Sequence, residues 1–398
     1  MRKADPWLTI LGLGEDGPDG LSAASLAALQ EAEVIIGPKR HLSLLPDLSA
    51  EQVEWPAPFA HGLPILQGFS GRKTVALASG DPFWHGAGSA ITRELDAGEW
   101  RALPASGTMS LAAAHLGWSL EKTPCFGLHA APFGRLRPHL ANGVQILATL
   151  RDGEAVDALA KWLTAQGFGR SQIHVLQALG GPREKTFTIR ADQGTKEAAH
   201  PVSVGLEIAG DGAALPLASG RPDSFFDNDG QITKRPVRAL TLSALAPQHG
   251  EHLWDIGGGS GSIAIEWLLS HPSLSATAIE INAERADRIA QNAERFGTNL
   301  TVKTGAAPKA LEGLNAPSAI FIGGGISDDM LRWIWANVAS GTRLVANAVT
   351  LEAEALLAQW HGDKGGDLMR IELAQSKPLG RKRGWNSSYP IVQWSVTL

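Results

Sequence analysis

The run LWDIGGGSGSIAIEWLL at residues 253–269 limits the possible folds of this chain more than any other feature. Asp255, Gly257, Gly259 and Gly261 form the pattern D-x-G-x-G-x-G between a strand-like apolar run and a helix-like run. Glycines are needed where a backbone turns sharply and must approach a ligand without a Cβ in the way. The run therefore predicts a strand–turn–helix unit of an α/β fold, with a ligand at the turn.

The spacing around this turn distinguishes between two cofactor classes. Glu280 follows nineteen residues after Gly261, where a carboxylate can accept the ribose hydroxyls of an adenosine. A dinucleotide fingerprint would require glycine at position 262, which is Ser262. Asp255 would repel a pyrophosphate but attract the ammonium group of a methionine. The residues favour S-adenosylmethionine over NAD, and an NAD-dependent oxidoreductase is the alternative from a different class.

A second glycine-rich turn lies in ILGLGEDG, where Gly12, Gly14 and Gly17 spell G-x-G-x-x-G. The Pro-Asp-Gly that follows would delay a helix, so the third glycine cannot lie in a first helical turn. The next apolar run, VIIGPKR, also ends without the acidic residue that would bind a ribose. A dinucleotide site is therefore not favoured in this half either.

Short apolar runs alternate with helix-like patterns along the 398 residues, which suggests an α/β protein of two or three domains. The pattern stops in a segment rich in Gly, Pro and Asp that ends at residue 230. We predict domains at 1–209 and 231–398, joined by a linker at 210–230. The last two apolar runs, LMRIELAQSKPL and PIVQWSVTL, are expected to pair as antiparallel strands at a sheet edge.

Composition excludes several classes of protein. The net charge of −5 provides no basic field for a nucleic acid. The single cysteine, Cys125, excludes an internal disulfide or a Cys-rich metal site, and the twelve histidines are scattered, so we predict no metal. No stretch approaches the ~18 apolar residues that span a bilayer. The first apolar stretch lacks a cleavage signal, and we expect a soluble, cytoplasmic protein.

Beyond residue 228, the runs ITKRPVRALTLSAL, LWDIGGGSGSIAIEWL, TGAAPKAL and IFIGGG resemble the decarboxylating methyltransferase family of cobalamin (vitamin B12) synthesis. That family methylates carbon 15 of precorrin-6B and removes the carboxyl group of the acetate at carbon 12. The resemblance implies a Rossmann-like domain, with the loop Gly323-Gly324-Gly325 as the floor where the methyl group is delivered. The implied cofactor contacts are Thr233, Asp255, Gly257, Gly258, Gly259, Ser260, Gly261, Glu280, Gly305, Ala306 and Ala307.

Residues 5–209 resemble the tetrapyrrole (corrin and porphyrin) methylase family, through ILGLGEDG, TVALASGDPFWHGAG and LPASGTMSLAAAHLGW. The resemblance implies two α/β lobes that bind a folded S-adenosylmethionine between them. Glu15-Asp16 stands where that family commonly has a Gly-Pro or Pro-Gly pair. Trp84 is a candidate wall of the substrate site. The implied cofactor contacts are Gly12, Gly14, Gly80, Asp81, Pro82, Ser106 and Thr149.

The two halves in this order resemble the bifunctional precorrin-6B methyltransferases. This implies one S-adenosylmethionine per half, carbon 5 methylation by the N-terminal half, precorrin-8X as product, and a homo-oligomer. The same chemistry on a cobalt-containing precorrin and a non-catalytic tetrapyrrole carrier are the open alternatives. Arg381, Lys382 and Arg383 form a basic loop that we expect to bind the substrate carboxylates. No catalytic proton donor can be identified from the sequence.

Overall fold

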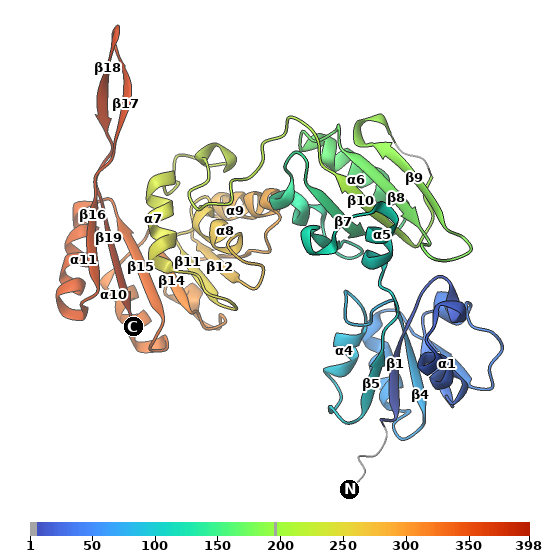
Figure 1. The fold of residues 1–398 in the computed structure, drawn as a ribbon. Coiled ribbons are helices and arrows are strands. Elements are labelled where there is room, and N and C mark those ends of the chain that lie inside the picture. The colour runs from blue at the N-terminus through green and yellow to red at the C-terminus, as the bar shows by residue number, and fades with distance from the viewer. Residues whose placement is uncertain (1–5, 195–196) are drawn as a thin grey trace. The chain divides into compact units, whose positions relative to one another are not determined.

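The computed structural model describes residues 6–194 and 197–398. The chain divides into two compact units (Figure 1): unit 1 is Met1–Phe133 with His139–Ala214, and unit 2 is Gly134–Pro138 with Leu215–Leu398. Residues 215–230, which the sequence analysis assigned to a linker, pack with unit 2. Strands and helices alternate along the chain in both units, which confirms the α/β class.

The first lobe of unit 1 is a parallel sheet with strand order β3-β2-β4-β1-β5. Leu8 and Ile10 of β1 pack in one buried cluster, and Leu11 and Leu13 in another, as expected for a sheet covered on both faces. Ser22 caps the first helix by accepting from the Ser25 N–H. The elements are β1 (Leu8–Leu13), α1 (Ala23–Gln30), β2 (Val34–Gly37), α2 (Lys39–Leu42), β3 (Glu51–Glu54), α3 (Gly62–Gln67), β4 (Thr74–Ser79), α4 (Gly88–Thr92) and β5 (Trp100–Leu103).

The second lobe of unit 1 is a mixed sheet with strand order β6-β7-β10-β8-β9, in which only β6 and β7 pair in parallel. A buried cluster joins Met109 and Ala112 of α5 to Leu147 of β7 and Leu176 of β8. The elements are α5 (Thr108–Leu116), β6 (Cys125–Gly127), β7 (Gln145–Thr149), α6 (Glu154–Ala165), β8 (Gln172–Gln177), β9 (Lys185–Arg190) and β10 (Val202–Glu207).

Unit 2 is built on a seven-stranded sheet with strand order β13-β12-β11-β14-β15-β19-β16. The first five strands in this order are parallel, so their carboxyl ends meet at one edge. One face packs on α10 and α11, and the other packs on α7 and α8. The elements are α7 (Arg235–Leu245), β11 (His252–Ile256), α8 (Ser262–Leu268), β12 (Ser275–Glu280), α9 (Ala283–Phe296), β13 (Thr301–Thr304), β14 (Ala319–Ile322), α10 (Asp328–Asn337), β15 (Arg343–Ala348), α11 (Leu351–Lys364), β16 (Asp367–Ile371) and β19 (Ile391–Thr397).

The last two apolar runs pair as predicted, because β16 is antiparallel to β19 at the sheet edge. Between them, β17 (Ala374–Leu379) and β18 (Lys382–Ser387) form a separate hairpin that projects from the sheet of unit 2 (Figure 1). The prediction of a basic loop is therefore wrong for Lys382 and Arg383, which lie on β18. Only Arg381 lies in the turn, because the cross-strand pairing continues to Leu379 and Lys382.

Candidate cofactor and substrate sites

The glycine-rich turn of unit 2 joins β11 to α8 at the carboxyl edge of the sheet. Gly257, Gly259 and Gly261 have φ angles of 71°, 59° and 74°, a region that side chains other than glycine rarely adopt. A Cβ on Gly257 would lie 2.8 Å from the backbone nitrogen of Gly324, and one on Gly261 would lie 2.8 Å from Ile289. Both conformation and space therefore require glycine here.

Glu280 ends the neighbouring strand β12 and fixes the turn. Its side chain is buried, and its Oε2 accepts from the Gly259 N–H at 2.9 Å. Its Oε1 accepts from the Asn282 N–H at 3.0 Å. Each carboxylate oxygen has two lone pairs, so each can accept one more hydrogen bond. The predicted ribose contact is compatible with this arrangement and stays a prediction.

Two further loops meet the turn at the same edge. The Gly305 N–H donates to the carbonyl of Glu280 at 2.9 Å, which places the loop Gly305-Ala306-Ala307 beside β12. The Gly323 N–H donates to the carbonyl of Ile256 at 2.9 Å, which places Gly323 and Gly324 beside the turn. The structure thus brings together the predicted residues at the carboxyl ends of β11, β12, β13 and β14. This is the edge at which open parallel sheets bind ligands.

Asp255 lies beneath the turn with an incompletely bonded carboxylate. Its Oδ2 accepts from the Ala264 N–H at 3.1 Å, and its buried Oδ1 has no hydrogen-bond partner among the described residues. The pKa of Asp255 is raised to about 7, mainly by burial and to a smaller extent by the charge of Glu280, while the hydrogen bond from Ala264 opposes the shift. The buried Oγ of Ser260, in the turn itself, also lacks a described partner. These two unpaired atoms fit a ligand that brings hydrogen-bond donors or a positive charge to the turn.

The Asp255 pKa predicts a pH-dependent stability of unit 2. An acid whose folded pKa exceeds its unfolded pKa of 3.8 stabilises the fold when protonated, and this stabilisation is lost as the pH rises through about 7. At ~1.4 kcal/mol per pKa unit, the ionised form costs on the order of 4 kcal/mol. Asp255→Asn should therefore raise the melting temperature of the ligand-free protein at pH 8, and much less at pH 5. Calorimetry at pH 8 and pH 5 measures the melting temperatures. An equal rise in melting temperature at both pH values would contradict a raised pKa of Asp255.

Residues 227–233 form a strap beside the turn, which the sequence analysis did not detect. The buried Asn292 of α9 donates to the carbonyls of Asp227 and Ser260, both at 2.9 Å. Asp229 pairs with Arg285 at 2.8 Å, and this hydrogen bond is the main cause that lowers the pKa of Asp229 to about 2. The strap and the turn are thus tied to the same helix, α9.

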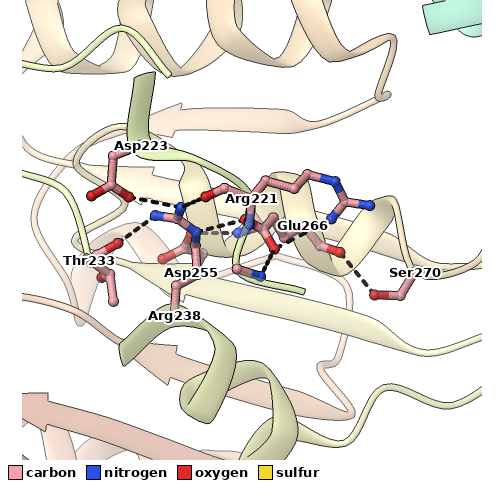
Figure 2. Close-up of polar contacts among 9 residues, drawn as sticks. Arg221, Asp223, Thr233, Arg238, Asp255, Glu266 and Ser270 are labelled. Atoms are coloured by element: carbon pink, nitrogen blue, oxygen red, sulfur yellow. Dashed lines mark hydrogen bonds and ion pairs between the residues drawn. The ribbon is translucent and has the colours of Figure 1, made fainter. Parts of the chain in front are cut away.

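A fully buried ion pair anchors the end of this strap (Figure 2). The guanidinium of Arg238 on α7 donates to Glu266 on α8 at 2.7 Å, and both side chains are 0% exposed. Arg238 also donates to the carbonyl of Thr233 at 2.5 Å and to Asp223 at 2.9 Å. Arg221 supplies further donors to Glu266. The pair thereby fixes Thr233, a predicted cofactor residue, through its backbone.

A charge inside an apolar run is the signal that could have revealed this pair. Glu266 interrupts SIAIEWLL, and a carboxylate on the buried side of a helix needs a partner. The sequence alone could not say which of several arginines supplies it.

The two lobes of unit 1 enclose a cavity of about 370 Å³. It is lined by the loops that follow β1 and β4 in the first lobe, and by the ends of β7 and β8 in the second. Six of the predicted cofactor and substrate residues line it together, namely Gly14, Gly80, Asp81, Trp84, Ser106 and Thr149.

Gly12 and Pro82 lie outside the lining of this cavity. A Cβ on Gly12 would overlap the carbonyl oxygen of Gly80, so this glycine allows β1 and the loop after β4 to pack closely. The carbonyl of Pro82 accepts from the Gly88 N–H at 2.8 Å, which fixes the Gly80-Asp81-Pro82 turn. Trp84, in contrast, is 52% exposed and stacks edge-on against His85.

The sequence analysis did not identify a charged cluster at this cavity. Glu15, noted only as a departure from a family pattern, is nearly buried and pairs with Arg40 and Arg183. His41 and Ser79 complete the cluster by contacting Arg40. Glu15 and Arg40 follow the ends of β1 and β2, and Ser79 is the last residue of β4, so the parallel sheet of the first lobe brings these three together.

Within residues 6–194 and 197–398, no group of three or more His, Cys, Asp or Glu side chains is arranged to bind a metal ion. In the same ranges, no helix has the length and apolar character needed to cross a membrane.

Two family models together match most of the chain. The model described as tetrapyrrole (corrin/porphyrin) methylases matches residues 8–193, and the model of a precorrin methyltransferase domain matches residues 224–398. The tetrapyrrole methylase model falls largely on unit 1, and the precorrin methyltransferase model falls on unit 2.

Three relatives illustrate what the chain is similar to. A Sinorhizobium precorrin-6Y C(5,15)-methyltransferase (decarboxylating) is 47% identical over 98% of this chain and 96% of that protein. A Salmonella typhimurium cobalt-precorrin-6B C(15)-methyltransferase (decarboxylating) is 34% identical over 40% of this chain and 85% of that protein. The crystal structure of the C-terminal domain of a Rhodobacter capsulatus precorrin-6Y C5,15-methyltransferase is 51% identical, with a TM-score of 0.45, and covers 46% of this chain and all of that one.

Proposed function

Because the chain belongs to the precorrin-6Y C(5,15)-methyltransferase (decarboxylating) family, we propose that it methylates carbons 5 and 15 of precorrin-6B and removes the carboxyl group of the carbon 12 acetate. The product is precorrin-8X, and S-adenosylmethionine is the methyl donor. The observation that supports this proposal is that the chain offers two separate candidate sites on two different folds, the glycine-rich edge of unit 2 and the cavity of unit 1. Two candidate sites are consistent with methylation at two different carbons.

The experiment is incubation of the purified chain with precorrin-6B and S-adenosylmethionine, followed by mass spectrometry. The expected product has two added methyl groups and lacks one carboxyl group. A non-catalytic carrier would return the substrate unchanged, and an oxidoreductase would require a nicotinamide cofactor for any conversion. If the chain converts the cobalt-containing precorrin but not precorrin-6B, the cobalt-containing compound is the substrate. The metal-free substrate is favoured because the cobalt-named relative matches only 40% of this chain.

In unit 2, the cofactor fits the groups that the turn leaves unpaired. The Oδ1 of Asp255 would accept from the methionine ammonium, and the spare lone pairs of Glu280 would accept from the ribose hydroxyls. When bound, S-adenosylmethionine supplies an electrophilic methyl group on a positively charged sulfur. The work of the protein is to align the reacting carbon with that group and to exclude water. Gly323 and Gly324 are the proposed floor on the substrate side.

In unit 1, the second cofactor would occupy the cavity between the lobes. Gly14, Gly80, Asp81, Ser106 and Thr149 line it and are the proposed contacts. Trp84 is the proposed wall toward the substrate, since the residue lines the cavity and is about half exposed. A homo-oligomer, and contacts from the hairpin residues Arg381, Lys382 and Arg383 to substrate carboxylates, also belong to this proposal.

Two cofactor sites predict a stoichiometry. Isothermal titration of the full chain with S-adenosylhomocysteine should show two molecules bound per chain. A chain divided after Ala214 leaves only Gly134–Pro138 of unit 2 on the first part, so it should give two folded parts that each bind one. A folded 1–214 fragment without binding would refute the site in unit 1.

A further inference from the structure

Arg40 occupies an unusual position for an arginine at the cavity of unit 1. It lies on α2, directly after the buried strand β2, and its side chain is only 28% exposed. The cavity wall around it is largely apolar, with Trp55, Leu77 and Ile91 among the lining residues. A charge in such surroundings is poorly hydrated and interacts strongly with any charge placed beside it.

Three neighbours hold this guanidinium in one orientation. Its Nη1 pairs with the carboxylate of Glu15. Its Nη2 donates to the Nε2 of His41 at 2.8 Å and to the Oγ of Ser79 at 3.1 Å. Glu15 in turn accepts from Arg183 of the second lobe at 2.8 Å. The guanidinium is therefore fixed before any ligand arrives.

His41 serves this arrangement as a hydrogen-bond acceptor. An arginine can only donate, so the Nε2 of His41 carries no proton and the ring proton is on Nδ1. Burial, with a smaller contribution from the charge of Arg40, lowers the pKa of His41 to about 3, so the ring stays neutral. The Nδ1 is buried and has no hydrogen-bond partner among the described residues. We regard His41 as a positioning residue for Arg40.

The guanidinium retains donors that its neighbours do not use. Of its five N–H groups, the contacts to Glu15, His41 and Ser79 occupy three, which leaves the Nε–H and one Nη1–H without an acceptor in the described parts of the chain. Glu15 is also shared between two arginines, so it neutralises neither fully. Burial and the charge of Arg183 lower the pKa of Arg40, as expected for an incompletely balanced charge.

We propose that Arg40 binds a carboxylate group of a ligand in the cavity of unit 1, through these two remaining donors. A carboxylate accepts from a guanidinium with two oxygens, and it supplies the negative charge that the cluster lacks. This inference rests on the proposed function, which brings two carboxylate-bearing ligands to the cavity. One is the corrin precursor with its acetate and propionate groups, and the other is the methionine part of the cofactor.

Three single variants test the proposal in the full chain. Arg40→Ala removes the donors, and Arg40→Lys keeps the charge but loses the fork of the guanidinium. Arg72→Ala is the matched control, because Arg72 belongs to the same lobe, does not line the cavity and pairs with the exposed Glu51. Loss of a charge-assisted contact should weaken ligand use by about 10- to 100-fold in Arg40→Ala, and less in Arg40→Lys.

Two measurements identify the source of the carboxylate. A rise in the precorrin-6B concentration that half-saturates carbon 5 methylation, with unchanged S-adenosylhomocysteine affinity, assigns it to the substrate. Weaker S-adenosylhomocysteine binding, with unchanged affinity for 5′-methylthioadenosine, which has no carboxylate, assigns it to the cofactor. These cofactor titrations are made with Gly259→Val also present, so that only unit 1 is observed.

Other results would overturn the proposal. If a folded Arg40→Ala chain keeps the wild-type half-saturating concentration of precorrin-6B and the wild-type affinity for S-adenosylhomocysteine, no ligand carboxylate contacts Arg40. An equal loss for both adenosine ligands would indicate a distorted cavity rather than a lost contact. If Arg40→Ala does not fold, the test depends on Arg40→Lys. The proposal is also refuted if Arg40→Lys keeps the wild-type half-saturating concentration of precorrin-6B and the wild-type affinities for both adenosine ligands. Carbon dioxide release by unit 2 is the internal reference, because its absence in the wild-type chain would count against the proposed function and not against Arg40.

Discussion

Replacement of Gly259 by valine should abolish carbon dioxide release and leave one bound S-adenosylhomocysteine per chain. Gly259 has a φ angle of 59°, which a β-branched residue adopts only with strain. A Cβ would also lie 3.1 Å from the carbonyl oxygen of Gln231 in the strap. Because the Gly259 N–H bonds Glu280, a shift of the turn would also displace the carboxylate proposed to hold the ribose. Titration calorimetry and mass spectrometry of the products measure both effects.

Asp81→Ala is the matched variant for unit 1. Asp81 lines the cavity and accepts from the Phe83 N–H at 2.8 Å, so its removal should loosen the turn after β4. The variant should still release carbon dioxide and give a product with one added methyl group. If a folded Asp81→Ala chain no longer releases carbon dioxide, the two units do not act independently and the proposed division of the chemistry is wrong.

Glu266→Gln should destabilise unit 2 by about 3–5 kcal/mol, the usual cost of removing one partner of a buried ion pair. The change keeps the shape of the side chain but leaves the buried Arg221 without a compensating carboxylate, and it leaves Arg238 with Asp223 alone. Since Arg238 also holds the carbonyl of Thr233, cofactor affinity in unit 2 should fall as well. Calorimetric unfolding and S-adenosylhomocysteine titration test both expectations.

Glu372→Ala provides the control for this effect. Glu372 pairs with Arg370 at 2.9 Å, but both side chains are more than half exposed. Solvent-exposed pairs contribute about 0–1 kcal/mol, so this variant should unfold close to the wild-type temperature. A similarly small effect of Glu266→Gln would mean that the buried pair does not stabilise unit 2.

The sequence alone predicted the features that depend on local backbone conformation. Glycine adopts positive φ angles at little cost, so the spaced glycines at 257, 259 and 261, between a strand-like and a helix-like run, located the turn after β11 without a structure. The order of apolar runs predicted the α/β class, and the spacing to Glu280 placed a carboxylate at the end of the next parallel strand. Each of these signals lies within about one strand–turn–helix unit.

The tertiary structure decided which charges are buried and paired. Glu266 and Arg238 are 28 residues apart, and Glu15 and Arg183 are 168 residues apart, so no local pattern joins them. The burial that raises the pKa of Asp255 likewise depends on α8 packing over β11. Burial and pairing depend on which faces of distant elements meet, and many arginines were equally available in the sequence. Only the folded chain selects Arg238 for Glu266, and Arg40 with Arg183 for Glu15.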